Sequence, residues 1–210
     1  MAACEDTVEK ADSYLTPRDL TLPGRSLPPA MPLIISSQDS WDPHSCKLET
    51  HQHNSQPQHL QLVTDTLQLL GTINKPVAVL SICGPYRSGK SYFISRLLGR
   101  PGAFELGHRM QACTRGIWMA TTVLECEQFA TILLDTEGID AIGASETMAM
   151  SLLTVTTLLS SYLIYNSKKV PQKVDLDKMR CFTQLSRSLL VQKGESMRAE
   201  VMSKFFPHFV

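Results

Sequence analysis

A glycine-rich loop that follows an apolar run is the feature of this sequence that most constrains its fold. Residues 77–83 (VAVLSIC) form a nearly continuous apolar run, which is typical of a strand buried on both faces. Residues 84–91 (GPYRSGKS) then satisfy the pattern G-x-x-x-x-G-K-[ST], and residues 92–98 resume with a helical period. A strand, this loop and a helix in that order predict a phosphate-binding loop.

The residue types in the loop match what binding a phosphate requires. Gly84 and Gly89 let the backbone fold around phosphate oxygens, and the amides at the helix start point at the anion. We expect Lys90 to reach the β- and γ-phosphates and Ser91 to ligate Mg²⁺. The predicted nucleotide-binding segment is the whole loop: Gly84, Pro85, Tyr86, Arg87, Ser88, Gly89, Lys90 and Ser91. The weaker alternative is a glycine-rich turn with an exposed lysine.

A second motif supplies the carboxylate that a bound metal needs. Residues 131–134 (TILL) are apolar and are followed by residues 135–138 (DTEG), a D-x-x-G pattern. A carboxylate at the carboxyl end of a buried strand can hold Mg²⁺ through water, so Asp135 is the predicted metal residue. The Gly138 amide is expected to sense the γ-phosphate. Asp135 as a simple turn residue is the weaker alternative.

The motifs alone leave the roles of two residues undecided. Thr114 lies between the two motifs and is a candidate Mg²⁺ ligand in a switch loop, but a surface threonine leading into a strand fits equally well. Arg87 lies inside the phosphate loop and could stabilise charge that develops during phosphoryl transfer. A solvent-facing arginine is the favoured alternative, because the x positions of the motif are free.

The remaining pattern predicts an α/β fold with the three layers of a P-loop NTPase. Its doubly wound sheet is expected to be mostly parallel. Further strands are expected at 116–124, 129–134 and 162–165, and helices at 146–158 and 175–192. Residues 147–167 carry no charge, but nine of these 21 are Ser, Thr or Asn, so a buried helix and strand fit better than a membrane span.

The first 60 residues differ in composition from the rest. They hold eight acidic and four basic residues, seven of the 12 prolines and one glycine. We expect residues 1–30 to be a disordered extension and residues 31–60 a poorly ordered lead-in with an edge strand at 33–35. Residues 61–210 form the predicted nucleotide-binding domain. This segment also holds five side chains that could ligate a metal: His44, Cys46, His51, His53 and His59. Because they lack the paired spacing of a zinc site, a metal site is the weaker alternative.

Composition argues against several function classes. The 210 residues carry 20 basic and 20 acidic side chains, and a net charge of zero argues against a nucleic-acid binder or a polybasic membrane-surface protein. The N-terminus lacks the basic start and apolar run of a signal peptide, and the six cysteines form no CxxC pair. Free thiols in a reducing cytoplasm are therefore expected.

Taken together, these motifs resemble the guanylate-binding proteins, which are large, dynamin-related GTPases with a GB1/RHD3-type G domain. The resemblance rests on residues 84–92, 114–119 and 133–138, and on residues 158–167, which are similar to the strand after the second switch. It covers residues 31–210 and implies that residues 61–210 are a partial GB1/RHD3-type G domain. It implies a Mg²⁺-dependent GTPase of innate immune defence that forms nucleotide-dependent homo- or heterodimers. A cytoplasmic location follows, with vesicle association as an option.

The resemblance also implies individual roles. Thr114 becomes the Mg²⁺ ligand of the first switch, and Arg87 matches the family's internal arginine finger, which replaces the solvent-facing interpretation. The second switch joins the nucleotide-binding set: Asp135, Thr136, Glu137 and Gly138. The predicted catalytic residues are Arg87, Lys90 and Glu137. The predicted metal ligands are Ser91, Thr114 and Asp135.

The chain departs from the family pattern in three places. Ala112 stands where a serine is usual, which predicts slow hydrolysis, and Pro85 stands where a flexible apolar residue is usual, which stiffens the loop. The family reads guanine just beyond the position of Val210, so a G domain cut short there is expected, with a sheet that is incomplete at the C-terminal end. The alternatives are a dimerising fragment that modulates full-length relatives and an ATP-using phosphate-loop protein.

Overall fold

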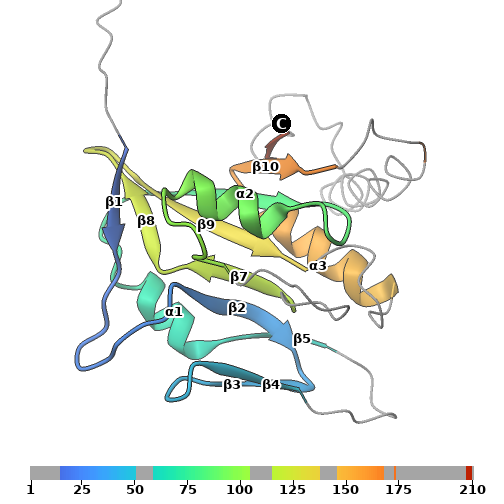
Figure 1. The fold of residues 1–210 in the computed structure, drawn as a ribbon, viewed down its shortest axis with the longest axis horizontal. Helices are drawn as coiled ribbons and strands as arrows, with labels where there is room; N and C mark the ends of the chain where they lie inside the picture. The colour runs from blue at the N-terminus through green and yellow to red at the C-terminus, as the bar shows by residue number, and fades with distance from the viewer. Residues whose placement is uncertain are drawn as a thin grey trace, which may run out of the picture.

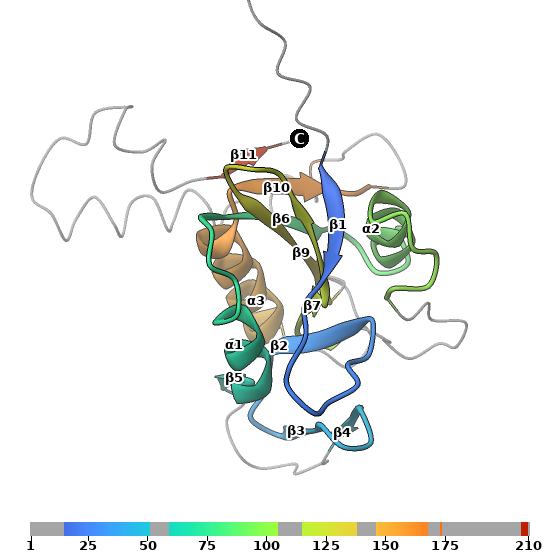
Figure 2. The same ribbon diagram turned by 90° about the vertical axis from the view of Figure 1, so that its left-hand side faces the viewer.

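A nine-stranded mixed sheet with helices on both faces organises the chain in this computed structural model (Figures 1 and 2). The structure describes residues 15–50, 59–104, 115–137, 146–167, 173 and 207–209, so the predicted helix at 175–192 lies outside it. The sheet strands are β1 (Thr16–Asp19), β2 (Ala30–Ser36), β5 (Leu60–Leu62), β6 (Val77–Cys83), β7 (Ile117–Ala120), β8 (Thr122–Glu125), β9 (Ala130–Thr136), β10 (Tyr162–Tyr165) and β11 (His208–Phe209). A separate hairpin consists of β3 (Asp39–Asp42) and β4 (Lys47–Thr50). The helices are α1 (Thr64–Leu70), α2 (Lys90–Leu97) and α3 (Glu146–Leu159).

The sheet has a parallel half and an antiparallel half. Its order is β11-β10-β6-β9-β7-β2-β5, with β8 also beside β9 and β1 beside β8. The α/β class is confirmed, but the sheet is not mostly parallel: five of the eight pairings are antiparallel and three are parallel. Two of the antiparallel pairings, β7 with β9 and β8 with β9, follow from the short connections between these strands, because a parallel neighbour needs a crossover of about a dozen residues. The other three are made by β1, β2 and β5, from the N-terminal part of the chain.

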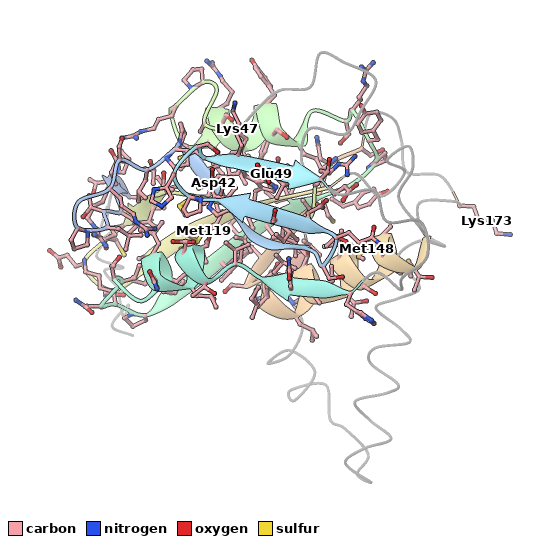
Figure 3. All side chains as sticks on the ribbon, turned by 90° about the horizontal axis from the view of Figure 1, so that it is seen from below. Asp42, Lys47, Glu49, Met119, Met148 and Lys173 are labelled. Carbon is pink, nitrogen blue, oxygen red and sulfur yellow. The ribbon has the colours of Figure 1, made fainter. Side chains whose placement is uncertain are left out.

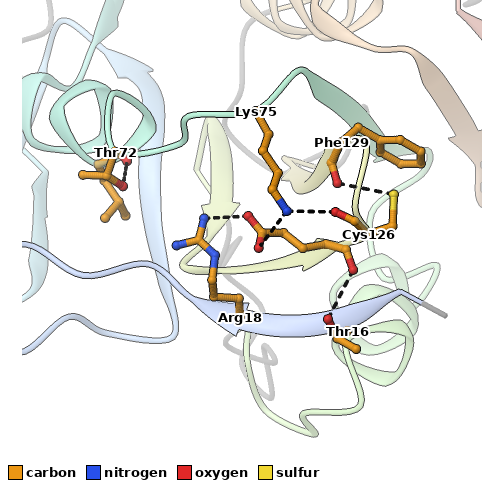
Figure 4. Close-up of polar contacts among 8 residues, drawn as sticks. Thr16, Arg18, Thr72, Lys75, Cys126 and Phe129 are labelled. Atoms are coloured by element: carbon orange, nitrogen blue, oxygen red, sulfur yellow. Dashed lines mark hydrogen bonds and ion pairs between the residues drawn. The ribbon is translucent and has the colours of Figure 1, made fainter. Parts of the chain in front are cut away.

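The segment before residue 50 contributes strands that the sequence analysis did not anticipate. β1 pairs with β8, and Arg18 of β1 donates to Oε1 of Glu125 in β8 at 2.7 Å (Figure 4). β2 lies between β7 and β5, inside the sheet. The expected disorder up to residue 30 and the expected edge strand therefore differ from the structure over its described residues. The division of the chain into domains stays a prediction.

β2 enters the sheet interior because its apolar run continues through a proline. All its residues from Ala30 to Ile35 are buried. The pairing with β7 shifts register between Pro32 and Ile34, which accommodates a residue that has no N–H to donate. The Pro32 carbonyl instead accepts a hydrogen bond of 2.6 Å from the Thr66 hydroxyl of α1. The high proline content of this segment therefore predicts disorder where the structure has an interior strand.

Helices cover opposite faces of the sheet, so the predicted three layers are confirmed (Figure 2). The core that includes α1 and α3 residues contains Met31, Leu69, Ile117, Met119, Leu134, Met148 and Leu152. The core that includes α2 residues contains Ile82, Ile94, Leu98, Phe104, Ala120 and Leu133. Neighbouring residues of β9 serve different cores, as the alternation of a strand requires.

The uncharged stretch folds as expected into a helix and a strand, α3 and β10. Among the residues that the structure describes, no helix combines the length and the apolar character needed to cross a membrane. Parallel pairing of β10 with β6 brings Tyr165 opposite Cys83, at the point where the glycine-rich loop begins. This register sets the edge on which the candidate site is built.

Candidate phosphate-binding site

The loop that follows β6 has a backbone that only certain residues can adopt. Three of its residues have positive φ angles: Gly84 at 140°, Arg87 at 58° and Gly89 at 91°. At Gly84 a Cβ atom would lie 2.3 Å from the carbonyl oxygen of Asn166, which follows β10. Glycine is required at this position both for its φ angle and for this close approach.

Hydrogen bonds close the loop on itself. The Ser88 amide donates to the Pro85 carbonyl at 3.2 Å, and Lys90 Nζ donates to the same carbonyl at 2.9 Å. Asn166 Nδ2 donates to the Ser88 carbonyl at 2.9 Å. Lys90 is only 6% exposed. Its ammonium group therefore lies over the loop, which does not match a simple turn with an exposed lysine.

Helix α2 begins directly at the end of this loop. Gly89 is the residue before its first turn, and no side chain caps the helix there. Backbone amides of a first helical turn lack carbonyl partners within the helix and form a favourable site for an anion, with the helix dipole adding to the attraction. The loop and the helix start thus have the backbone arrangement that binds phosphate.

A hydroxyl and a carboxylate meet beside the loop. Ser91, in the first turn of α2, donates a hydrogen bond of 2.6 Å to Oδ2 of Asp135 near the end of β9. Asp135 is fully buried. The two residues meet because Ile82 of β6 pairs with Asp135 in the parallel register, and the carboxyl ends of parallel strands share one edge. Hydroxyl and carboxylate oxygens are ligands that Mg²⁺ prefers, so this pair fits that ion.

The two residues after Asp135 are held by backbone partners. The Thr136 hydroxyl donates to the Ile82 carbonyl at 2.9 Å, which ties β9 to β6. The Glu137 amide donates to the Gly116 carbonyl at 2.8 Å, and Oε2 of Glu137 accepts the Gly116 amide at 3.1 Å. Burial raises the pKa of Glu137, and the Gly116 amide and the positive charge of Arg115 oppose this rise.

The remaining predicted site residues divide into placed and undescribed ones. Arg87 lies on the loop with its guanidinium carbon 5.6 Å from the ring centroid of Tyr86, a cation–π contact. Thr114, Gly138 and the nearby Ala112 lie outside the described residues. Of the predicted metal ligands, the described part of the chain therefore brings together Ser91 and Asp135.

Sequence reasoning missed two residues that shape the site. Asn166 donates a hydrogen bond to the loop and directly follows β10, which is a parallel neighbour of β6. Ligand sites form at the carboxyl ends of such parallel strands, and this rule could have identified Asn166. Gly116 lies where a Cβ atom would be 2.1 Å from the Ile34 carbonyl oxygen. No local pattern marks that contact.

A hollow of about 340 Å³ lies beside β1 and the segment after α2, and none of residues 84–91 lines it. Its two arginines, Arg25 and Arg100, already pair with Asp65 and Asp19 respectively. In the part of the chain that the structure describes, no three His, Cys, Asp or Glu side chains gather in a way that could hold a metal. The loop remains the better supported anion site.

Comparison with known proteins identifies similar sequences. The family model "Guanylate-binding protein, N-terminal domain" matches residues 57–210. Guanylate-binding protein 4 of Homo sapiens is 32% identical over 162 residues, which are 74% of this chain and 25% of that protein. Guanylate-binding protein 2 of Rattus norvegicus is 35% identical over 159 residues, 72% of this chain and 27% of that protein. The chain thus spans about a quarter of the length of these curated relatives.

A solved structure gives a more distant likeness. Toc33 from Arabidopsis thaliana, in a dimerization deficient mutant form, matches 57% of this chain and 48% of that chain, with a TM-score of 0.36 and 19% sequence identity. A likeness this distant adds nothing to the fold or function derived from the site.

Proposed function

Because this chain belongs to the guanylate-binding protein family, we propose that it binds GTP at the loop 84–91 and hydrolyses it by phosphoryl transfer to water. The observation that carries the proposal is the 2.6 Å hydrogen bond between Ser91 and Asp135. It joins a hydroxyl and a carboxylate beside a phosphate-binding loop, which is the donor pair that a nucleotide-bound Mg²⁺ requires.

In this proposal the described binding residues act from their observed positions. The loop backbone and the start of α2 bind the β-phosphate, and Lys90 exchanges its bond to the Pro85 carbonyl for bonds to the β- and γ-phosphates. Ser91 would hold Mg²⁺ directly, and Asp135 would hold it through water. Mg²⁺, when bound, neutralises charge on the phosphate oxygens. Thr114 is the proposed third ligand, from the family pattern alone.

The proposed catalytic residues are Arg87, Lys90 and Glu137. Arg87 lies on the loop that is proposed to bind the phosphates, in contact with the Tyr86 ring. In its proposed role it leaves that ring and stabilises charge that develops on the leaving oxygen. Glu137 directly follows β9 and is held by Gly116. We assign its carboxylate the role of orienting the attacking water. Lys90 stabilises the charge that develops on the transferred group.

Family membership alone supports the wider proposals. These are a dynamin-like GTPase of innate immune defence, nucleotide-dependent dimers with related GTPases, and a cytoplasmic location with association to vesicles. A non-catalytic chain that dimerises with longer relatives is the alternative, and the experiment below separates it from an enzyme.

The test combines nucleotide binding with single-turnover hydrolysis. Calorimetry would compare GTP with ATP, each with Mg²⁺ and with EDTA. Hydrolysis by the wild-type chain would be compared with that by Arg87→Ala, and Arg96→Ala would be the matched control, because Arg96 is an exposed arginine near the end of α2. We expect Mg²⁺-dependent GTP binding and a turnover that Arg87→Ala lowers at least about tenfold and Arg96→Ala leaves unchanged.

Each other outcome contradicts part of the proposal. Binding without turnover in any variant would favour the dimerising modulator. Binding of ATP but not of GTP would make the chain an ATP-using phosphate-loop protein. Binding of neither nucleotide would exclude the loop as a nucleotide site.

A further inference from the structure

The hairpin β3–β4 follows β2 and lies beside it at one end of the molecule (Figures 1 and 3). Its strands pair from Asp39↔Thr50 to Asp42↔Lys47. Gln61 of β5 anchors it, because Gln61 Nε2 donates to the Asp39 carbonyl at 2.8 Å. Although the hairpin lies at the surface, its Asp39 side chain is only 7% exposed. A carboxylate buried in such a place indicates that the hairpin packs against something charged or polar.

Two hairpin side chains contact the start of β7 and the residue two positions before it. The ring of Trp41 packs edge-on against the ring of Trp118, with centroids 5.8 Å apart and an interplanar angle of 87°. Trp118 in turn donates from Nε1 to the Arg115 carbonyl at 2.8 Å. Asp39 Oδ1 lies 4.0 Å from Nη1 of Arg115, an ion pair. The hairpin therefore holds Arg115 twice, by its side chain and through its carbonyl.

The next residue, Gly116, is where this support reaches the site. Its amide and carbonyl bond to the carboxylate and the amide of Glu137, at 3.1 Å and 2.8 Å. Gly116 itself has a φ angle of 81° and is so close to β2 that a Cβ atom would lie 2.1 Å from the Ile34 carbonyl oxygen. A shift of Arg115 would therefore move Gly116, and with it Glu137.

We propose that Asp39 and Trp41 are positioning residues for Glu137, which they hold in place through Arg115 and Gly116. The proposal rests on the proposed function in one respect: the positioned Glu137 acts on a nucleotide. The contacts can be tested without nucleotide, so the two proposals can fail separately. Glu137 comes directly after β9, and the hairpin belongs to a different part of the chain, so the hairpin sets the geometry of the second switch from outside it.

The first experiment measures amide hydrogen exchange in the full chain without nucleotide. In Asp39→Asn and in Trp41→Leu we expect the Gly116 and Glu137 amides to exchange about tenfold faster, because their hydrogen bonds open more often. The Ile82 amide within β6 should be unchanged, which shows that the fold is intact. Glu49→Gln is the control, since Glu49 is an exposed carboxylate on the same hairpin. Unchanged exchange at Gly116 and Glu137 would overturn the proposal.

The second experiment follows GTP hydrolysis in the presence of Mg²⁺. We expect Asp39→Asn to lower kcat about tenfold with KM changed less than about twofold, Asp39→Glu to restore most of it, and Glu49→Gln to have no effect. Rescue is expected because the longer side chain still reaches Arg115. A normal kcat in Asp39→Asn would overturn the positioning role. If the wild-type chain shows no turnover, the proposed function fails, and the exchange experiment alone decides whether the hairpin positions Glu137.

Discussion

Ser91 and Asp135 share a 2.6 Å hydrogen bond although they come from different elements, the first turn of α2 and the end of β9. Asp135 is fully buried, so its carboxylate is screened from water and held in one orientation. A metal ion bound between these groups would meet ligands that are already positioned. This relationship makes the metal dependence of nucleotide binding the most direct property to measure.

Asp135→Asn is expected to weaken nucleotide binding only when Mg²⁺ is present. The substitution keeps the shape of the side chain and removes the charge that holds the ion. We expect GTPγS to bind on the order of tenfold to hundredfold more weakly in Mg²⁺ and equally well in EDTA, measured by calorimetry. Asp65→Asn is the matched control, because Asp65 pairs with Arg25 outside the loop. An equal loss of affinity in both conditions would exclude a metal role.

Removing the loop ammonium should affect binding with and without the metal. Lys90 is buried and bonded to the Pro85 carbonyl, so it is poised at the loop rather than in solvent. We expect Lys90→Ala to lower GTPγS affinity by about a hundredfold, since hydrogen bonds between charged groups are among the strongest. Lys75→Ala, at a lysine that pairs with Glu125, should leave affinity unchanged. Undiminished affinity in Lys90→Ala would place the nucleotide elsewhere.

Gly84→Ala should destabilise the protein far more than a glycine substitution at an open position. A Cβ atom at Gly84 would collide with the Asn166 carbonyl, whereas Gly99, with a φ angle of 67°, has no atom within 4 Å. We expect the free energy of unfolding to fall by about 3 kcal/mol in Gly84→Ala and by about 1 kcal/mol in Gly99→Ala. Urea unfolding measures both. Equal losses would mean that backbone strain, and not the contact, explains the glycine.

The loop and its two flanking elements could be predicted because their signals are local. An apolar run, glycines at fixed spacing and a helical period all lie within residues 77–98. The D-x-x-G pattern likewise comes directly after its own strand, β9. Such segments carry their structural information in neighbouring residues, so one sequence is enough to identify them.

The rest of the site depends on contacts between distant parts of the chain. β1 has four exposed residues and no apolar period, and only its pairing with β8 makes it a strand. The ion pair of Asp39 with Arg115 likewise needs the hairpin to lie beside the start of β7. Neither placement leaves a periodic trace in the sequence, and the prolines around β2 gave an opposite signal. Non-local pairing is the information that a single sequence withholds.

The position of β2 inside the sheet predicts a large stability effect in a segment that the sequence predicts to be a poorly ordered lead-in. Ile34 is buried and pairs with both Ile117 and Leu62. We expect Ile34→Ala to lower the free energy of unfolding by about 3 kcal/mol, through lost burial and a residual cavity. Leu62→Ala, at a side chain that is 58% exposed on β5, should cost less than about 1 kcal/mol. If urea unfolding gave similarly small losses for Ile34→Ala and Leu62→Ala, the interior position of β2 in the sheet would be contradicted.

Asp19 should contribute stability that depends on pH. Its carboxylate accepts the Thr122 hydroxyl at 2.6 Å and pairs with Arg100 at 2.7 Å. The hydrogen bond from Thr122, followed by that from Arg100, lowers the pKa of Asp19 from its ordinary value of 3.8. Because the native pKa is the lower one, the stabilisation is complete above the unfolded pKa and is lost as the pH falls through the native value.

Asp19→Asn should therefore unfold more easily than wild type at pH 7, by less than about 1 kcal/mol because the side chain is 54% exposed and solvent screens the pair. The difference should stay constant down to about pH 5 and then close below pH 3.8. Urea unfolding across this range measures it, with Glu49→Gln as a control for the loss of one exposed charge. If the difference in free energy of unfolding widened on acidification, the charged Asp19 carboxylate would be destabilised in the native state. The contacts with Thr122 and Arg100 would then not stabilise its charged form.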